Sequence, residues 1–212
     1  GSKGIHKKNL RILGNLPLVG HSIKTALNLK NLDKIYVSTD CEEIANISSK
    51  LGAEIIKRPK ELASDESPEI LSWKHAIDFS LKKHGDFNTF LSLPPTSPLR
   101  SIQDVKNCIN SLIKDVDLVF TMSKSKRNPW FNMVTKDKEG RISLIKGNLS
   151  INRRQSAPVC YDLTTVAYAA KTSFILNTNN LWSGNVVGVE IPEERAIDID
   201  TPFDLELVEK FF

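Results

Sequence analysis

The sequence has no long hydrophobic run: no stretch reaches the roughly 18 consecutive apolar residues that a membrane-spanning helix needs. It has only three cysteines, Cys41, Cys108 and Cys160, which are too widely spaced for a disulfide framework or a metal-binding motif. Its net charge is a mild +4, which favours anionic ligands only slightly. We therefore expect no membrane span, no nucleic-acid partner and no disulfide scaffold, with a reducing cytoplasm as the simplest location.

The histidines also lack a pattern typical of catalysis. The four are His6, His21, His75 and His84, and they do not cluster in the sequence. No serine or cysteine stands in a nucleophile elbow or in triad spacing. We expect the histidines to be structural, and any chemistry to depend on other residue types.

What the sequence does contain is an alternation of β-forming and helical segments over its first 122 residues. Strands are predicted at 34–39, 53–57, 89–93 and 118–122, and helices at 17–29, 67–83 and 101–113. A further helix should follow Asp40, with that residue as its N-cap and Glu43 completing a capping box. This pattern predicts an α/β fold of three layers, with a mostly parallel, mixed sheet between helices.

The pattern changes after residue 122. Residues 130–135 and 141–145 are typical of a β-hairpin that turns around Gly140. Further strands are expected at 166–170 and 186–189, and a last helix at 202–212. We interpret residues 1–212 as a single domain with an antiparallel excursion over about 127–165.

The first nine residues form a motif rich in glycine and lysine. Glycine permits backbone angles that turn several N–H groups toward one anion, and lysine adds a point charge that suits phosphate. The residues concerned are Gly1, Ser2, Lys3, Gly4, Lys8 and Asn9. The motif favours a polyphosphate-binding loop, and the alternative is a frayed basic terminus.

A second candidate centre is Asp198 and Asp200, just ahead of the C-terminal helix. Thr201 suits the N-cap of that helix, Pro202 its first position and Asp204 the capping partner. In an extended segment, residues two apart point to the same side, so both carboxylates can approach one Mg2+. The alternative is that both are surface charges interacting with the helix dipole.

Five segments, in order along the chain, resemble motifs of the acylneuraminate cytidylyltransferase family, the CMP-sialic acid synthetases. They are Gly1 to Asn9; Arg58-Pro59 with Leu62; Pro95 to Arg100; residues 152–168 with Arg154, Gln155 and Tyr168; and 196–204 with Asp198 and Asp200. The chain departs from the family at His6 in place of proline, at Pro94 in place of a sugar-contacting glutamine, and at 164–166 in place of Asn-Gly-Ala. These departures leave the identity of the sugar open.

The resemblance implies a Rossmann-like nucleotidyltransferase fold and transfer of CMP from CTP to a nine-carbon 2-keto sugar acid, with release of pyrophosphate. It implies nucleotide binding by Gly1, Ser2, Lys3, Lys8, Asn9 and Arg58, and sugar binding by Arg154, Gln155 and Tyr168. Lys3, Lys8, Asp198 and Asp200 would be catalytic, with Mg2+ on the two aspartates. It also implies a homodimer in which the excursion is the dimerisation arm, and the segment around Arg154 is most similar to enzymes for legionaminic-type sugars.

Two other interpretations stay open: a CMP-Kdo-type synthetase, and a non-catalytic nucleotide-binding paralogue. The resemblance further implies an apolar strand ahead of the phosphate loop. We expect about six to ten residues upstream of Gly1 to form it, the length of an ordinary strand. A chain that begins at Gly1 should then be unstable and bind CTP weakly.

Overall fold

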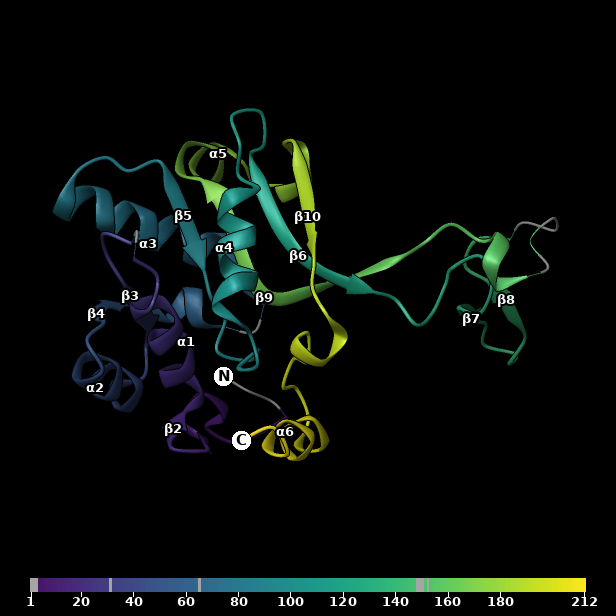
Figure 1. The fold of residues 1–212 in the computed structure, drawn as a ribbon, viewed down its shortest axis with the longest axis horizontal. Helices are drawn as coiled ribbons and strands as arrows, with labels where there is room; N and C mark the ends of the chain where they lie inside the picture. Colours follow the sequence, from purple (N-terminus) through teal and green to yellow (C-terminus); the bar gives the residue numbers. More distant parts are fainter. Residues whose placement is uncertain (1–3, 31, 65, 148–150, 152) are drawn as a thin grey trace.

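The computed structural model describes residues 4–30, 32–64, 66–147, 151 and 153–212. Its main sheet is four-stranded, in the order β10-β6-β9-β5 (Figure 1). The strands are β5 (Thr89–Ser92), β6 (Leu118–Lys124), β9 (Tyr161–Lys171) and β10 (Val186–Glu190). β10 pairs parallel with β6, whereas β9 is antiparallel to both of its neighbours. The predicted α/β fold with a mixed sheet is confirmed.

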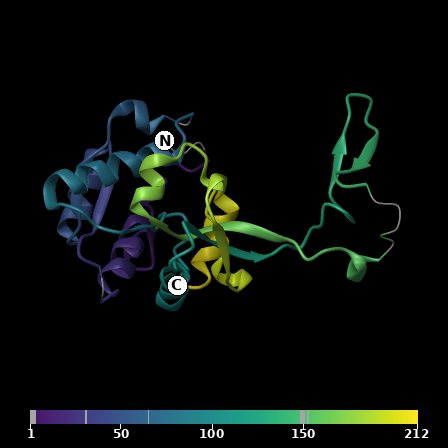
Figure 2. The same ribbon diagram turned by 90° about the horizontal axis from the view of Figure 1, so that it is seen from above.

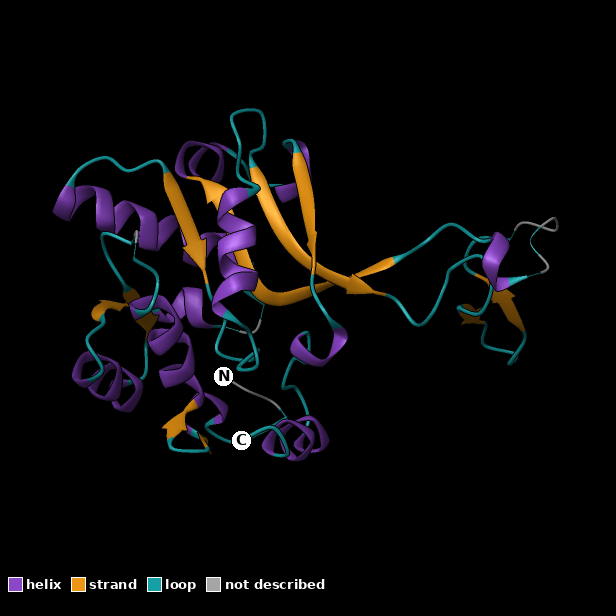
Figure 3. Ribbon diagram, in the orientation of Figure 1, coloured by secondary structure: helices purple, strands orange, loops and turns teal. Residues whose placement is uncertain are grey.

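Helices cover both faces of this sheet (Figure 3). The α-helices are α1 (Leu18–Leu27), α2 (Glu42–Lys50), α3 (Glu69–His84), α4 (Ile102–Asn110), α5 (Thr172–Asn177) and α6 (Pro202–Glu209). Short 3-10 helices are η1 (Lys8–Leu10), η2 (Lys60–Ala63), η3 (Arg154–Ser156), η4 (Leu181–Ser183) and η5 (Glu193–Arg195). None of the helices in the described ranges has the length and apolar character needed to cross a membrane.

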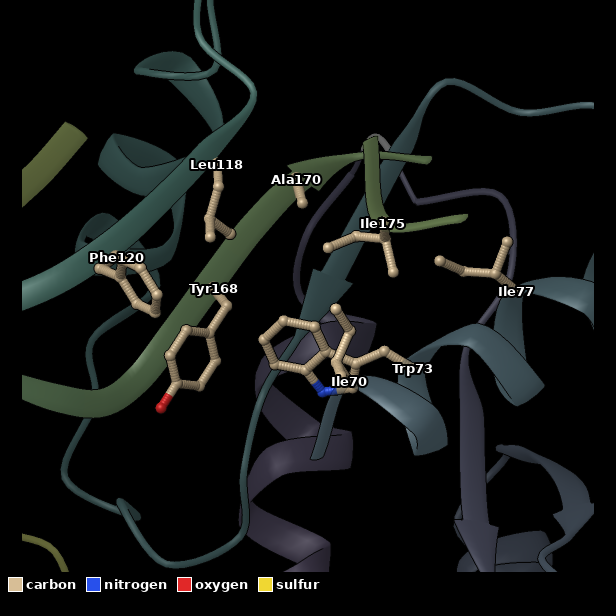
Figure 4. Close-up of a cluster of buried hydrophobic side chains, with 8 residues drawn as sticks. All are labelled: Ile70, Trp73, Ile77, Leu118, Phe120, Tyr168, Ala170 and Ile175. Atoms are coloured by element: carbon tan, nitrogen blue, oxygen red, sulfur yellow. The ribbon is translucent and has the colours of Figure 1, made fainter. Parts of the chain in front are cut away.

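The core has two sides because successive residues of β9 point to opposite faces of the sheet. Tyr168 and Ala170 pack against α3 and α5, in the cluster that Figure 4 shows. Ala167 and Ala169 pack on the other face, where α4 contributes Val105 and the buried Cys108. Residues 166–170 of β9 are therefore buried on both sides, and the position of this part of the strand is fixed.

A separate parallel pair, β3 (Tyr36–Thr39) and β4 (Glu54–Lys57), lies beside this sheet. In the described part of the chain, β3 pairs only with β4 and β5 only with β9. Residues of β3 and β5, together with α1 and α3, line a cavity of about 2140 Å3. Residues 6–10 line it as well, so the end of the predicted phosphate loop borders this cavity.

Capping boxes are present at the N-termini of two helices. Ser101 and Asp104 cap α4, and Thr201 and Asp204 cap α6. The box expected at Asp40 is wrong: the N-cap of α2 is Cys41, with no side-chain capping bond. The Glu43 carboxylate instead accepts hydrogen bonds from the Lys7 ammonium at 2.7 Å, which removes it from the helix terminus.

An arm projects from the body between the end of β6 and the start of β9 (Figure 2). Its base is the pair Lys124 and Tyr161, the last in the β6–β9 ladder. It carries the expected hairpin, β7 (Val134–Lys136) with β8 (Ile142–Leu144). A second hairpin precedes α1 and was not predicted from the sequence. It consists of β1 (Ile12–Leu13) and β2 (Leu16–Pro17).

Candidate active site

The segment that holds the two aspartates is anchored through the residue between them. Ile199 is fully buried in a cluster with Ile5 and Val208, and its N–H donates to the Thr96 carbonyl at 2.8 Å. Because side chains alternate in an extended segment, Asp198 and Asp200 point away from that cluster. Asp198 is half-buried and Asp200 is exposed.

Lys8 joins the N-terminal loop to this segment. Its ammonium donates to the Ile199 carbonyl at 2.6 Å and to Asp200 Oδ1 at 3.1 Å. The backbone at Gly4 also lies close to the backbone at Asp200. A Cβ at Gly4 would lie 2.2 Å from the Asp200 carbonyl oxygen. The structure thus brings together two predicted site segments from opposite ends of the chain.

Asp198 is held by hydroxyl groups. Thr165 donates to its Oδ1 at 2.9 Å, and Ser97, which is fully buried, lies 2.6 Å from the same Thr165 hydroxyl. The sequence identified Thr165 only as a departure from the family pattern, and Ser97 only as part of a rigid turn. Both contribute to the site through contacts between distant segments.

A buried cation lies beside Asp198. Arg100 donates from Nε to the Val166 carbonyl at 2.8 Å, from Nη1 to Ser22 Oγ at 2.6 Å and from Nη2 to the Pro94 carbonyl. Burial lowers the pKa of Arg100 to about 9, although the charge of Asp198 raises it. Arg100 therefore stays protonated at neutral pH and places a fixed positive charge behind the aspartate. Pro94 contributes a backbone acceptor to this network, a role that its side chain did not suggest.

The opposite wall of the cavity also carries charges. Arg58 donates to the hydroxyl and carbonyl of Ser38 at 3.1 and 2.7 Å. Burial lowers the pKa of Arg58, while the charges of Asp40 and Glu69 raise it. Burial raises the pKa of the Glu69 carboxyl, and the charge of Asp198 raises it further. A hydrogen bond with Trp73 and the charge of Arg58 lower the same pKa. The charges of Arg58 and Glu69 thus influence each other, and both residues line the cavity; sequence reasoning missed Glu69.

Tyr168 lies at the edge of the core. Its ring packs against Trp73 and Phe120, at centroid distances of 5.3 and 5.5 Å, and Figure 4 shows its hydroxyl pointing out of the cluster. Burial and the charges of Glu69 and Asp198 raise the pKa of this phenol. The hydroxyl is therefore a neutral group near the aspartates.

The predicted sugar-binding pair does not reach the site within one chain. Arg154 and Gln155 lie exposed in η3, on the projecting arm (Figure 2). The Arg154 guanidinium donates to the Lys126 carbonyl of the same arm at 3.0 Å. These residues therefore meet the aspartates only if another chain brings its arm to this site.

The structure describes only part of the predicted phosphate-binding loop. Gly1, Ser2 and Lys3 lie outside the described residues. Asn9 lies in η1 and lines the cavity, where its side-chain oxygen is buried without a hydrogen-bond partner in the described part of the chain. That oxygen is available to a ligand with a donor group.

The donor set suits Mg2+ more than a softer metal. No group of three or more His, Cys, Asp or Glu side chains in the described ranges could hold a metal ion. Two carboxylates that lie beside an expected triphosphate site nevertheless fit Mg2+, which takes its remaining ligands from water and phosphate. Asp198 and Asp200 would be the residues that hold it.

Comparisons with known proteins identify the family of this chain. Residues 1–140 match the sequence profile of a family described as cytidylyltransferase. The chain is 34% identical over 212 residues to the CMP-N,N'-diacetyllegionaminic acid synthase of Campylobacter jejuni, covering 99% of this chain and 89% of that protein. It is 33% identical, with the same coverage, to post-translational flagellin modification protein B of Campylobacter coli. It is also 27% identical to the N-acylneuraminate cytidylyltransferase of Escherichia coli, covering 98% of this chain and 48% of that protein.

Solved structures show the same fold. A CMP:2-keto-3-deoxy-manno-octonic acid synthetase complexed with CTP superposes with a TM-score of 0.70 at 16% identity, covering 100% of this chain and 93% of that one. The 4-diphosphocytidyl-2C-methyl-D-erythritol synthase of Anaerococcus prevotii gives a TM-score of 0.67 at 16% identity, covering 95% and 90%. The chain belongs to the cytidylyltransferase family and has its Rossmann-like nucleotidyltransferase fold.

Proposed function

We propose that this cytidylyltransferase transfers CMP from CTP to the anomeric hydroxyl of a nine-carbon nonulosonic acid and releases pyrophosphate. The observation that carries the proposal is the meeting of Lys8 with the segment of Asp198 and Asp200 beside the cavity. A cation from the phosphate loop and two carboxylates at one place suit a triphosphate and its counterion. The names of the relatives that match nearly the whole chain support the nonulosonic acid as acceptor.

In this mechanism the sugar hydroxyl attacks the α-phosphorus in line. The bond between the α-phosphorus and the bridging oxygen breaks, pyrophosphate leaves with that oxygen, and the hydroxyl proton passes to solvent. The protein contributes positioning and charge. Lys8 neutralises phosphate charge, with Lys3 and the loop amides expected to do the same, and Arg58, which lines the cavity, would bind the nucleotide. When bound, Mg2+ supplies further neutralisation of the triphosphate.

The acceptor requires residues from the arm, and we propose a homodimer for this reason. Arg154 suits a carboxylate through its two-pronged guanidinium, but it lies on an arm that leaves its own body. The arm exposes large apolar side chains, which typify protein interfaces. They are Phe131, Val134, Ile142, Leu144 and Ile145. In a symmetric dimer, each arm would bring Arg154 and Gln155 to the partner's site, where Tyr168 borders the acceptor.

We propose a cytoplasmic location, supported by the three cysteines, which are free. The second candidate acceptor is an eight-carbon Kdo-type acid, which the CTP-bound structural neighbour favours. Its sequence identity of 16% is well below that of the nonulosonate relatives, so we place it second.

Pyrophosphate release with CTP and a panel of eight- and nine-carbon 2-keto sugar acids tests the function. We expect turnover with a nine-carbon acid, dependence on Mg2+, and loss of activity with a chelator. Asp198→Ala and Asp200→Ala should each lower turnover on the order of a hundredfold, as for removal of a major electrostatic stabiliser. Release of pyrophosphate only with eight-carbon acids would support the second candidate, and binding of CTP without turnover would indicate a non-catalytic paralogue.

A further inference from the structure

β9 contains a bulge next to the site. In its ladder with β6, Phe120 lies opposite Tyr168, whereas the next residue, Thr121, lies opposite Thr164. Residues 165–167 therefore have no partner on β6, and the register shifts at this point. Bulges of this kind redirect side chains, and they are common beside active sites.

A buried threonine closes the bulge. The Thr121 hydroxyl, fully inaccessible to solvent, lies 3.1 Å from both the N–H and the carbonyl oxygen of Ala167. The Thr164 hydroxyl lies 2.8 Å from it on the other side. These contacts replace part of the ladder hydrogen bonding that the extra residues interrupt. The bulge is therefore a defined local structure.

The bulge aims two groups at the site. The Val166 carbonyl receives the Nε–H of Arg100, and the Thr165 hydroxyl lies between Ser97 and Asp198. An ionised carboxylate can only accept, so the single proton of Thr165 is donated to Asp198 Oδ1. The Thr165 oxygen then accepts from Ser97 at 2.6 Å, which gives a directed chain from Ser97 through Thr165 to Asp198.

The chain of hydroxyls engages one oxygen of the carboxylate. No other side chain or N–H group in the described part of the molecule donates a hydrogen bond to Asp198. Oδ1 is therefore fixed by Thr165, and Oδ2 is left available to a cation. Partners that orient a metal-binding carboxylate contribute to metal affinity through geometry, without touching the metal.

We propose that Thr165, presented by the β9 bulge and supported by Ser97, is a positioning residue that orients Asp198 for a divalent cation. The proposal rests on the proposed function of Asp198 as a cation ligand. It also gives a physical role to the threonine at which this chain departs from its family's usual pattern: the residue adds a hydroxyl that reaches the aspartate.

The test is binding of Mn2+, used as a paramagnetic substitute for Mg2+, to the protein with CTP present, measured by electron paramagnetic resonance. Thr165→Val keeps the shape and removes the hydroxyl. We expect its Mn2+ affinity to fall about tenfold to a hundredfold, as for loss of a partner that orients a ligand. Thr165→Ser keeps the hydroxyl and should bind Mn2+ nearly as wild type does. Thr25→Val, in α1, is the matched control and should have no effect, because the Thr25 hydroxyl donates to the His21 carbonyl of its own helix.

The outcomes separate the proposed metal function of Asp198 from the proposed positioning role of Thr165. If the wild-type protein binds no Mn2+ beyond what CTP alone binds, the proposed metal function of Asp198 is wrong. If the wild type binds Mn2+ and Thr165→Val binds it equally well, the positioning role is wrong and the metal function stands. If Thr165→Val folds poorly, Ser97→Ala tests the same chain of hydroxyls. Weaker Mn2+ binding by Ser97→Ala with an unchanged melting temperature supports the proposal. Unchanged Mn2+ binding contradicts it.

Discussion

The ammonium of Lys8 and the carboxylate of Asp200 lie 3.1 Å apart although 192 positions separate them in the sequence. The contact connects the phosphate-loop region to the segment ahead of α6. Lys8 is largely buried at this contact, with 13% of its side chain exposed, while Asp200 retains 71%. The lysine is thus held in place, and the carboxylate faces solvent.

Replacing Lys8 with methionine should weaken CTP binding about tenfold to a hundredfold, because a hydrogen bond from a charged group is worth roughly 1.5–3 kcal/mol. Calorimetric titration with CTP measures this. Lys50→Met is the matched control, since Lys50 is exposed at the end of α2 and does not line the cavity. Equal weakening in both variants would indicate a general charge effect in place of a specific contact.

Gly4 is predicted to tolerate no side chain. A Cβ at this position would lie 2.2 Å from the Asp200 carbonyl oxygen, and both atoms belong to the backbone. Gly4→Ala must therefore displace the loop or the aspartate segment, and a displacement of about 1 Å can reduce turnover about a hundredfold. Gly147→Ala, where nothing lies within 4 Å, should leave the turnover number unchanged. Wild-type rates in Gly4→Ala would show that the two segments do not need this proximity.

The proposed exchange of arms predicts complementation between two inactive variants. Asp198→Ala removes a site residue from the body of a subunit, and Arg154→Ala removes one from its arm. Mixed after unfolding and refolding, they should recover about a quarter of wild-type activity, because half of the symmetric dimers are mixed and each mixed dimer has one intact site. No recovery, with dimers present by sedimentation, would place Arg154 in its own subunit's site or outside the reaction.

A pH effect on stability is expected at Asp104. Burial alone would raise its pKa, but hydrogen bonds from Arg195 and Ser101 outweigh burial and hold the pKa below its ordinary value of 3.8. A depressed carboxyl pKa contributes stability above the unfolded pKa, and this contribution is lost as the pH falls through the folded pKa. Asp104→Asn should lower the free energy of unfolding by roughly 1–3 kcal/mol at pH 7, and by less below about pH 4.

Urea unfolding at pH 7 and at pH 3 measures the difference. The control is Asp86→Asn, at an exposed residue. A penalty for Asp104→Asn that is the same at both pH values would show that the loss of packing, and not the loss of charge, is responsible.

The facing edges of β3 and β5 predict where the expected upstream strand would lie. Each edge lacks a partner strand in the described part of the chain, and the two border one cavity. A buried amide without a partner costs roughly 1–3 kcal/mol. We expect an apolar, valine-rich extension of about six residues ahead of Gly1 to slow hydrogen exchange of Tyr36–Thr39 and Thr89–Ser92 and to raise the melting temperature.

A Gly/Ser extension of equal length is the control and should protect neither strand. Slow exchange at both edges in the 212-residue chain without an extension would show that the edges are already paired or covered, and the expectation of a further strand would be wrong.

Much of the fold follows from local signals. The predicted helices and strands correspond to observed elements because their apolar residues recur with the correct period. The boxes at Ser101 and Thr201 are present because both partners lie within one helical turn. The box at Asp40 fails because Lys7, distant in the sequence, binds Glu43. The β1 hairpin was missed because two-residue strands carry almost no periodicity.

The site was less accessible to sequence reasoning. Family resemblance identified Lys8, Asp198 and Asp200, but no local pattern reveals that Arg100 is buried behind Asp198 or that Thr165 reaches it. Both contacts depend on the β9 bulge, which is created by pairing with β6. Arg154 shows the reverse case: its residue type suits a carboxylate, and only the fold reveals that it lies on the arm.

β9 is one continuous strand that begins at Tyr161, where the arm starts, passes Thr165 four residues later, and enters the core at Tyr168. The proposed assembly and the proposed cation binding would therefore depend on one strand. In the proposed dimer, contact of the arm with a partner subunit would act on the same strand that carries the Thr165 hydroxyl. Subunit contact would then tighten the cation site, and Mn2+ affinity should rise with protein concentration across the range in which dimers form.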